Sequence, residues 1–259
     1  PTPPAEVTSR VHPTIGRMPS AGSEPPIADG ATLRVEVLSV VFQIRVPQTR
    51  NTPDTDDPSL CVLLSRSADG VWTLPGGGVG AEETLSASAR RLVADALDVR
   101  EIAHLEQLSV FSDPHRVPTV RTIASTYMGL VPSDADATPP DAAGWFAVDG
   151  LPPLAFDHAG IVEAARHRLA AKLSYTNIAF ALAPARFPMS ALSEIYCAAL
   201  GYPVDTTNLL RILSRRAVVV ATGTVGKTGR NGGRPPALYA FAEKELRVTD
   251  EFATLRPPM

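Results

Sequence analysis

The chain has 259 residues, of which 44% are hydrophobic and 20% are charged, and its formal net charge is -3 at pH 7. This length fits one large domain or two moderate ones, and the apolar fraction suffices for well-packed cores. No run approaches the roughly 18 apolar residues of a membrane-spanning helix, and no N-terminal apolar segment resembles a signal peptide. We therefore expect a soluble, cytoplasmic protein with no membrane partner.

The two cysteines, Cys61 and Cys197, stand far apart in apolar runs. We interpret them as reduced core thiols. No histidine pairs with a cysteine or with another histidine at a spacing that ligates metal, so we predict no zinc site.

Seven prolines fall within the first 26 residues, and residues 1–31 show no apolar periodicity. This composition predicts a disordered or extended N-terminal tail, with the fold beginning near Thr32.

Residues 32–173 alternate between strand-like and helix-like segments. Runs rich in β-branched residues predict strands at Leu33–Val46, Leu60–Arg66, Leu105–Phe111, Val120–Val131 and Trp145–Val148. Apolar residues at helical spacing predict a helix over Thr84–Leu97, and Asp157 is expected to cap a second helix that ends near Leu173. The fold class predicted here is an α/β sandwich.

The pattern changes in residues 174–248. Short helices are predicted at Tyr175–Leu182, Ser190–Leu200 and, capped by Asp205, Thr206–Arg215. Strands are predicted at Val218–Val220 and Ala237–Phe241, on either side of a glycine-rich loop. Short helices followed by a two-stranded ribbon are typical of a C-terminal winged helix-turn-helix domain. Residues 249–259 are assigned to a C-terminal tail.

The segment from Gly77 to Val99 resembles the Nudix box, G-x5-E-x7-R-E-U-x-E-E-x-G-U, where U is a bulky aliphatic residue. The residues that fall on the pattern are Gly77, Glu83, Arg91, Val93 and Val99. The preceding Leu74-Pro75-Gly76 is the usual lead-in to this motif. The resemblance implies a Nudix-like sandwich with a nucleotide pocket.

The acidic positions of this motif are altered. In active Nudix enzymes, glutamates on one helix face hold divalent cations against a pyrophosphate. The corresponding positions here are Leu92, Asp95 and Ala96, which share a face at i, i+3, i+4 spacing. Because leucine and alanine do not ligate magnesium, we predict that hydrolysis is lost or very weak, with no catalytic residue and no metal, although Glu82 and Glu83 remain.

A nucleotide can still bind such a pocket. The loop Gly76–Gly78 leads towards a helix N-terminus, where backbone N–H groups suit phosphate. Candidate ligand contacts are Gly76, Gly77, Gly78, Glu83, Arg66, Arg116 and Arg121. The arginines are chosen because a guanidinium binds phosphate through two hydrogen bonds, but each also fits an ordinary surface arginine.

Residues 208–236 carry six positive charges and no negative one, so the remainder of the chain carries -9. This polarity favours an anionic partner such as DNA, with a solvated basic face as the alternative. Candidate DNA contacts on the second helix of the helix-turn-helix are Thr206, Thr207, Asn208, Arg211, Arg215 and Arg216. Those in the wing are Lys227, Arg230 and Arg234. Asparagine suits adenine and arginine suits guanine.

Taken together, the two halves resemble the Nudix-related transcriptional regulators of NAD metabolism, the NrtR family. Besides the Nudix segment, the resemblance rests on Leu105–Leu108, Phe111–Pro114, Trp145-Phe146, Leu154–His158, Lys172–Phe180 and Arg234–Tyr239. Position by position, the family's Nudix glycines and glutamate correspond to Gly76, Gly77 and Glu83. Its recognition-helix asparagine corresponds to Asn208 and its wing arginine to Arg234.

The resemblance implies a homodimeric repressor of NAD biosynthesis and salvage genes. Such a protein binds palindromic double-stranded operator DNA and is released by ADP-ribose or a related NAD-derived nucleotide, with no required cofactor. One alternative is an active Nudix pyrophosphohydrolase of the ADP-ribose class with an accessory DNA-binding domain. A second alternative is a constitutive DNA-binding protein whose front domain serves only for dimerisation.

Overall fold

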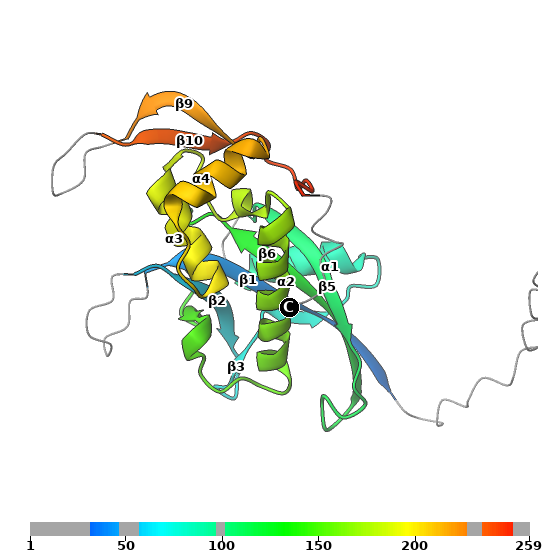
Figure 1. Ribbon diagram of the computed structural model, residues 1–259. Coiled ribbons are helices and arrows are strands. Elements are labelled where there is room, and N and C mark those ends of the chain that lie inside the picture. Colours follow the sequence, from blue (N-terminus) through cyan, green and yellow to red (C-terminus); the bar gives the residue numbers. More distant parts are fainter. Residues whose placement is uncertain (1–31, 47–56, 97–101, 227–234, 251–259) are drawn as a thin grey trace, which may run out of the picture. The chain divides into compact units, whose positions relative to one another are not determined.

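The computed structural model describes residues 32–46, 57–96, 102–226 and 235–250 (Figure 1). A seven-stranded sheet is centred on β1 (Leu33–Arg45), which pairs in parallel with β6 (Arg121–Val131). The remaining strands of this sheet are β2 (Ser59–Arg66), β3 (Trp72–Thr73), β4 (Gly76–Gly78), β5 (His104–Phe111) and β7 (Ala143–Ala147). On the edge of β1 opposite β6, both β2 and β4 pair antiparallel, which places the glycine loop against the central strand.

Both faces of β1 are buried because a helix packs on each. Successive strand residues point to opposite faces. Val37 belongs to a core cluster with Ala89 of α1 (Leu85–Ala96), whereas Leu38 and Val40 belong to the core cluster that contains Ile161 of α2 (His158–Tyr175). The predicted α/β sandwich is therefore confirmed.

The predicted elements of the front half are present with small changes of boundary. The strand predicted to end at Val148 ends at Ala147, and a 3-10 turn, η1 (Val148–Gly150), follows it. Asp157 does precede α2, but its side chain makes no capping hydrogen bond. The short strands β3 and β4 were not predicted, since two or three residues carry no periodicity.

The back half forms a winged helix. Its elements are the 3-10 turn η2 (Ile178–Ala181), α3 (Met189–Leu200), α4 (Thr206–Arg215) and a three-stranded sheet of β8 (Phe187–Pro188), β10 (Ala237–Phe241) and β9 (Val219–Val225). Asp205 caps α4 as predicted, and its Oδ1 accepts the backbone N–H of Asn208 at 2.7 Å. The helix predicted over Tyr175–Leu182 is wrong, because α2 continues to Tyr175 and only η2 follows.

The core is continuous from the sheet to the winged helix. One buried cluster contains Phe42 of β1, Leu169 of α2, Leu192 of α3 and Leu209 of α4. The boundary between Leu173 and Ser174 stays a prediction, because α2 runs across it. None of the helices in the described ranges is long and apolar enough to cross a membrane.

Candidate nucleotide and DNA sites

The glycine loop lies tightly against β1. A Cβ at Gly76 would stand 2.5 Å from the backbone oxygen of Val37, so only glycine fits this position. Gly77 is opposite Val37 and Gly78 is opposite Glu36 in the β1–β4 pairing. The loop therefore runs from this strand pair towards the N-terminus of α1.

Glu83 organises the turn between the loop and α1. Its Oε1 accepts Nε of Arg91 at 2.7 Å, and its Oε2 accepts the Ser88 hydroxyl at 2.7 Å and the N–H of Gly80 at 3.1 Å. The hydrogen bonds from Arg91 and Ser88 hold the pKa of the Glu83 carboxyl at about 2, so it is ionised at neutral pH. A carboxylate with these partners holds the loop in shape.

The altered acidic face does not fit a divalent cation. Leu92 covers the loop, since a Cβ at Gly77 would lie 2.9 Å from its Cδ2 atom. Ala96 packs beside a buried cluster that includes Val93, and Asp95 is exposed, with Oδ2 3.6 Å from Nη1 of Arg91. No group of three or more His, Cys, Asp or Glu side chains that could hold a metal ion occurs within the described ranges. Hard cations need several oxygen ligands, whereas Leu92, Asp95 and Ala96 together supply one carboxylate, that of Asp95.

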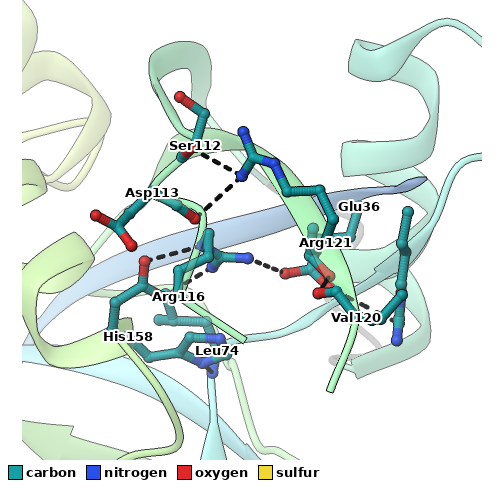
Figure 2. A network of polar contacts seen from close by, with 11 residues as sticks. Glu36, Leu74, Ser112, Asp113, Arg116, Val120, Arg121 and His158 are labelled. Atoms are coloured by element: carbon teal, nitrogen blue, oxygen red, sulfur yellow. Dashed lines mark hydrogen bonds and ion pairs between the residues drawn. The ribbon is translucent and has the colours of Figure 1, made fainter. Parts of the chain in front are cut away.

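Two of the three candidate arginines lie close together, and Figure 2 shows them beside Glu36. Arg121 donates from Nη1 to the carbonyl oxygens of Ser112 and Asp113, at 2.9 and 3.1 Å. Arg66 lies elsewhere, at the β2–β3 turn, where Nε donates to the carbonyl oxygen of Gly70 at 3.1 Å. The structure therefore does not bring Arg66 together with the other two.

Arg116 occupies an internal position instead of a pocket wall. Its side chain is 1% exposed, and Nη1 donates to Glu36 Oε1 at 2.7 Å. Nε and Nη2 donate to the two oxygens of Asp157, at 2.9 and 2.8 Å. Each of these nitrogens already donates to a carboxylate of the protein. The structure therefore shows Arg116 in an internal network of ion pairs and not in the predicted contact with the nucleotide.

Glu36 was not among the predicted site residues, and Asp157 was predicted as a helix cap and as part of the family-like run Leu154–His158. A charged residue inside the apolar run of β1 was the available signal, since buried carboxylates are rare unless paired. Next to this pair, the buried His158 accepts the backbone N–H of Leu74 on Nδ1 at 3.0 Å. Burial lowers the pKa of His158, which favours the neutral ring that this acceptor role requires.

Helix α4, which the sequence predicts to be the recognition helix, has one buried and one exposed side. Leu209 and Leu213 are buried, whereas Thr207, Asn208, Arg211 and Arg215 are exposed, and Thr206 is half-buried. Nη2 of Arg211 donates to Oδ1 of Asn208 at 2.5 Å. A polar face with an amide and a guanidinium side by side has the donors and acceptors that read base edges in a major groove.

The remaining DNA candidates divide into two groups. Arg216 donates from Nη1 to the carbonyl oxygen of Ser174 at 3.0 Å and from Nη2 to Asp250 at 2.5 Å. Arg216 therefore joins the end of α4 to Ser174 and Asp250, and it does not belong to the exposed polar face that carries Arg211. The predicted wing contacts Lys227, Arg230 and Arg234 lie outside the described residues.

Comparisons with known proteins match both halves. Residues 37–165 match the model of the NUDIX domain, and residues 179–241 match that of the NrtR DNA-binding winged helix domain. The chain is 29% identical over 201 residues to the ADPR responsive transcriptional repressor NtrR of Acinetobacter baylyi. This match covers 72% of this chain and 78% of that protein.

Solved structures share the two-domain fold. Shewanella oneidensis NrtR is 25% identical with a TM-score of 0.65, over 80% of this chain and 93% of that one. The same protein complexed with a 27mer DNA gives 24% identity and a TM-score of 0.64 over the same shares. A MutT/nudix family protein from Enterococcus faecalis gives 19% and 0.58, over 84% of this chain and 89% of that one. With identities of 24% and 19%, the last two matches show only that the fold is shared.

Proposed function

Because the chain belongs to the NrtR family of Nudix-related transcriptional regulators, we propose that it is a ligand-responsive repressor of NAD biosynthesis and salvage genes. It binds operator DNA through the winged helix and is released by ADP-ribose or a related NAD-derived nucleotide held in the Nudix-like domain. The observation that carries this proposal is the exposed polar face of α4 in a fold that also contains a Nudix-type glycine loop.

The proposed DNA contacts on α4 are Thr206, Thr207, Asn208, Arg211 and Arg215. The wing residues Lys227, Arg230 and Arg234 remain proposed contacts on the strength of the sequence and the family. The proposed nucleotide site comprises Gly76–Gly78 with Glu83 shaping the loop and Arg121 nearby. Arg116 and Arg216 are left out because carboxylates of the protein already hold them.

We further propose that the protein acts as a homodimer on a palindromic operator. One short recognition helix offers few base contacts, and a two-fold dimer doubles them. The half-sites are then expected about one helical turn of DNA apart, or a multiple of that spacing.

The proposal is tested by fluorescence anisotropy on DNA from upstream of NAD-synthesis genes, with ADP-ribose titrated in. We expect tight binding without the nucleotide and release with it. Arg211→Ala should abolish operator binding, while ADP-ribose still raises the melting temperature of the variant. Arg90→Ala removes the same charge from the exposed surface of α1 and serves as the matched control. Operator affinity that is insensitive to ADP-ribose, NAD and NADP would contradict the sensing function.

The same samples decide between sensor and enzyme. We propose that the domain does not hydrolyse its ligand, because Leu92 and Ala96 stand where cation ligands are needed. ADP-ribose incubated with the protein and magnesium or manganese should be recovered intact by chromatography. Rapid metal-dependent conversion would instead support the pyrophosphohydrolase.

A further inference from the structure

The N-terminus of α2 is bonded to both sides of the glycine loop. Before the loop, the N–H of Leu74 donates to Nδ1 of His158 at 3.0 Å. At the last residue of the loop, Gly78 pairs with Glu36, whose carboxylate binds Arg116, and Arg116 in turn binds Asp157. We call the set Glu36, Arg116, Asp157 and His158 the loop clamp. The glycine loop is therefore connected to the start of α2 through Leu74 on one side and through Glu36 and Arg116 on the other.

The entry to α2 is strained. Phe156 has a φ of 50°, a backbone conformation that is costly for a bulky side chain, and the residue is 61% exposed. Such strain persists only where the surroundings over-determine the conformation. Here the loop clamp, which begins at the next residue, supplies that constraint.

The other end of α2 is bonded to the DNA-binding half. Asn177, two residues beyond the helix, donates from Nδ2 to the carbonyl oxygen of Glu245 and accepts the N–H of Arg247 on Oδ1. The carbonyl oxygen of Tyr175 accepts the N–H of Thr249 at 2.7 Å. Arg216, which follows the recognition helix, donates to the carbonyl oxygen of Ser174 at 3.0 Å.

Between these ends α2 is a single unbroken helix of 18 residues, which spans about 27 Å. Its buried residues Ile161, Ala165, Leu169 and Leu173 pack in one core cluster with residues of the sheet and of α3 and α4. The helix therefore forms a continuous packed connection between the loop clamp and the end of α4.

We propose that Asp157 and His158 are positioning residues that couple the occupancy of the glycine loop to the orientation of the recognition helix through α2. This inference rests on the proposed function. In the absence of nucleotide the loop clamp holds α2 in the DNA-binding arrangement, and a phosphate-bearing ligand on the loop favours a second arrangement. Coupling of this sort requires only that the ligand binds the two arrangements with different affinity.

The test uses three variants of the full chain. His158→Leu keeps an apolar side chain but removes the acceptor for Leu74, and His158→Asn keeps an acceptor near the position of Nδ1. Asp157→Asn keeps the shape but removes the charge that pairs with Arg116. The matched control is Arg166→Gln, a change on α2 away from the clamp that breaks the ion pair between Arg166 and Asp149 of η1. For each variant, operator Kd is measured with and without saturating ADP-ribose, and ADP-ribose Kd by calorimetry.

We expect operator Kd without nucleotide to rise in His158→Leu and Asp157→Asn, because these changes loosen the clamp that holds the DNA-binding arrangement, and to stay within threefold of the unmodified protein in His158→Asn and Arg166→Gln. The weakening of operator binding by ADP-ribose, typically about 5- to 150-fold in allosteric proteins, should fall at least fivefold in His158→Leu and Asp157→Asn. It should be retained in His158→Asn and Arg166→Gln.

Full weakening in both His158→Leu and Asp157→Asn would overturn the inference, as would an equal loss in Arg166→Gln. Loss of ADP-ribose binding itself would place these residues in the ligand site and also overturn the positioning role. A lack of any nucleotide effect in the unmodified protein would instead contradict the proposed function from which the inference starts.

Discussion

At the scale of single residues, the arrangement of charge inside this protein depends on Arg116. Glu36 and Asp157 come from different parts of the chain and both face this one guanidinium. A buried charge without a partner is costly, whereas a paired one is tolerated. The ion pairs thus explain why a strand as apolar as β1 carries a glutamate.

Replacing Arg116 by methionine should destabilise the protein strongly. The change leaves Glu36 and Asp157 without their cation, and we expect a loss of about 3 kcal/mol in the free energy of unfolding. Arg34→Met is the control, because Arg34 lies 3.7 Å from the same Glu36 but is 54% exposed, and its loss should cost less than about 1 kcal/mol. Urea denaturation of both variants checks this, and equal losses would contradict the assigned role of Arg116.

At the scale of elements, the end of α4 is unusual. The N–H of Val218 donates to the carbonyl oxygen of Leu213, and that of Ala217 to Ser214, which is the Schellman pattern of helix termination. The residue at the left-handed position is usually glycine, but here it is Ala217, with a φ of 52°. The recognition helix is therefore fixed in length by a motif that carries some strain.

Ala217→Gly should stabilise the protein. Glycine adopts the left-handed conformation without the clash of a Cβ atom, and we expect a gain of about 0.5–1 kcal/mol. Ala221→Gly, in the exposed strand β9, should instead lower stability, because glycine weakens a strand interior. Thermal unfolding of the two variants distinguishes the effects. A destabilised Ala217→Gly protein would show that the left-handed position is not strained.

At the scale of the whole molecule, charge is divided unevenly along the chain. Residues 208–236 are strongly basic within a protein whose net charge is -3. Such a distribution concentrates favourable interactions with phosphate in one module and leaves the remainder acidic. It favours a binding mode in which only the winged helix approaches DNA.

Operator affinity should therefore fall steeply with salt, since each neutralised phosphate releases counterions. We expect log Kd to rise linearly with log salt concentration between about 50 and 200 mM, with a slope that reports several phosphate contacts. Arg215→Ala should lower this slope by about one if Arg215 contacts a phosphate, whereas Arg90→Ala should leave it unchanged. A flat salt response would contradict binding through the basic module.

Sequence patterns predicted much of the fold and part of the site. The periodicity of side chains located the long strands and α1, α3 and α4, and the capping of α4 by Asp205 is confirmed. The Nudix spacing placed Gly77 and Glu83 around one loop. Comparison with the same pattern identified Leu92 and Ala96 as positions where the usual glutamates are replaced. These features are local, because a few neighbouring residues determine periodicity, caps and motif spacing.

Only the tertiary structure decided which distant residues meet. Arg116 lies 80 residues from Glu36 and 41 from Asp157 in the chain, and Arg216 lies 34 from Asp250. A single sequence shows the charge of each side chain but not its partner, so these arginines fitted ligand and DNA contacts equally well. In the fold, Arg116 and Arg216 are both held by carboxylates that lie far along the chain. The sequence alone thus identified the two modules, because their motifs are local, and the fold revealed the contacts through α2 that connect them.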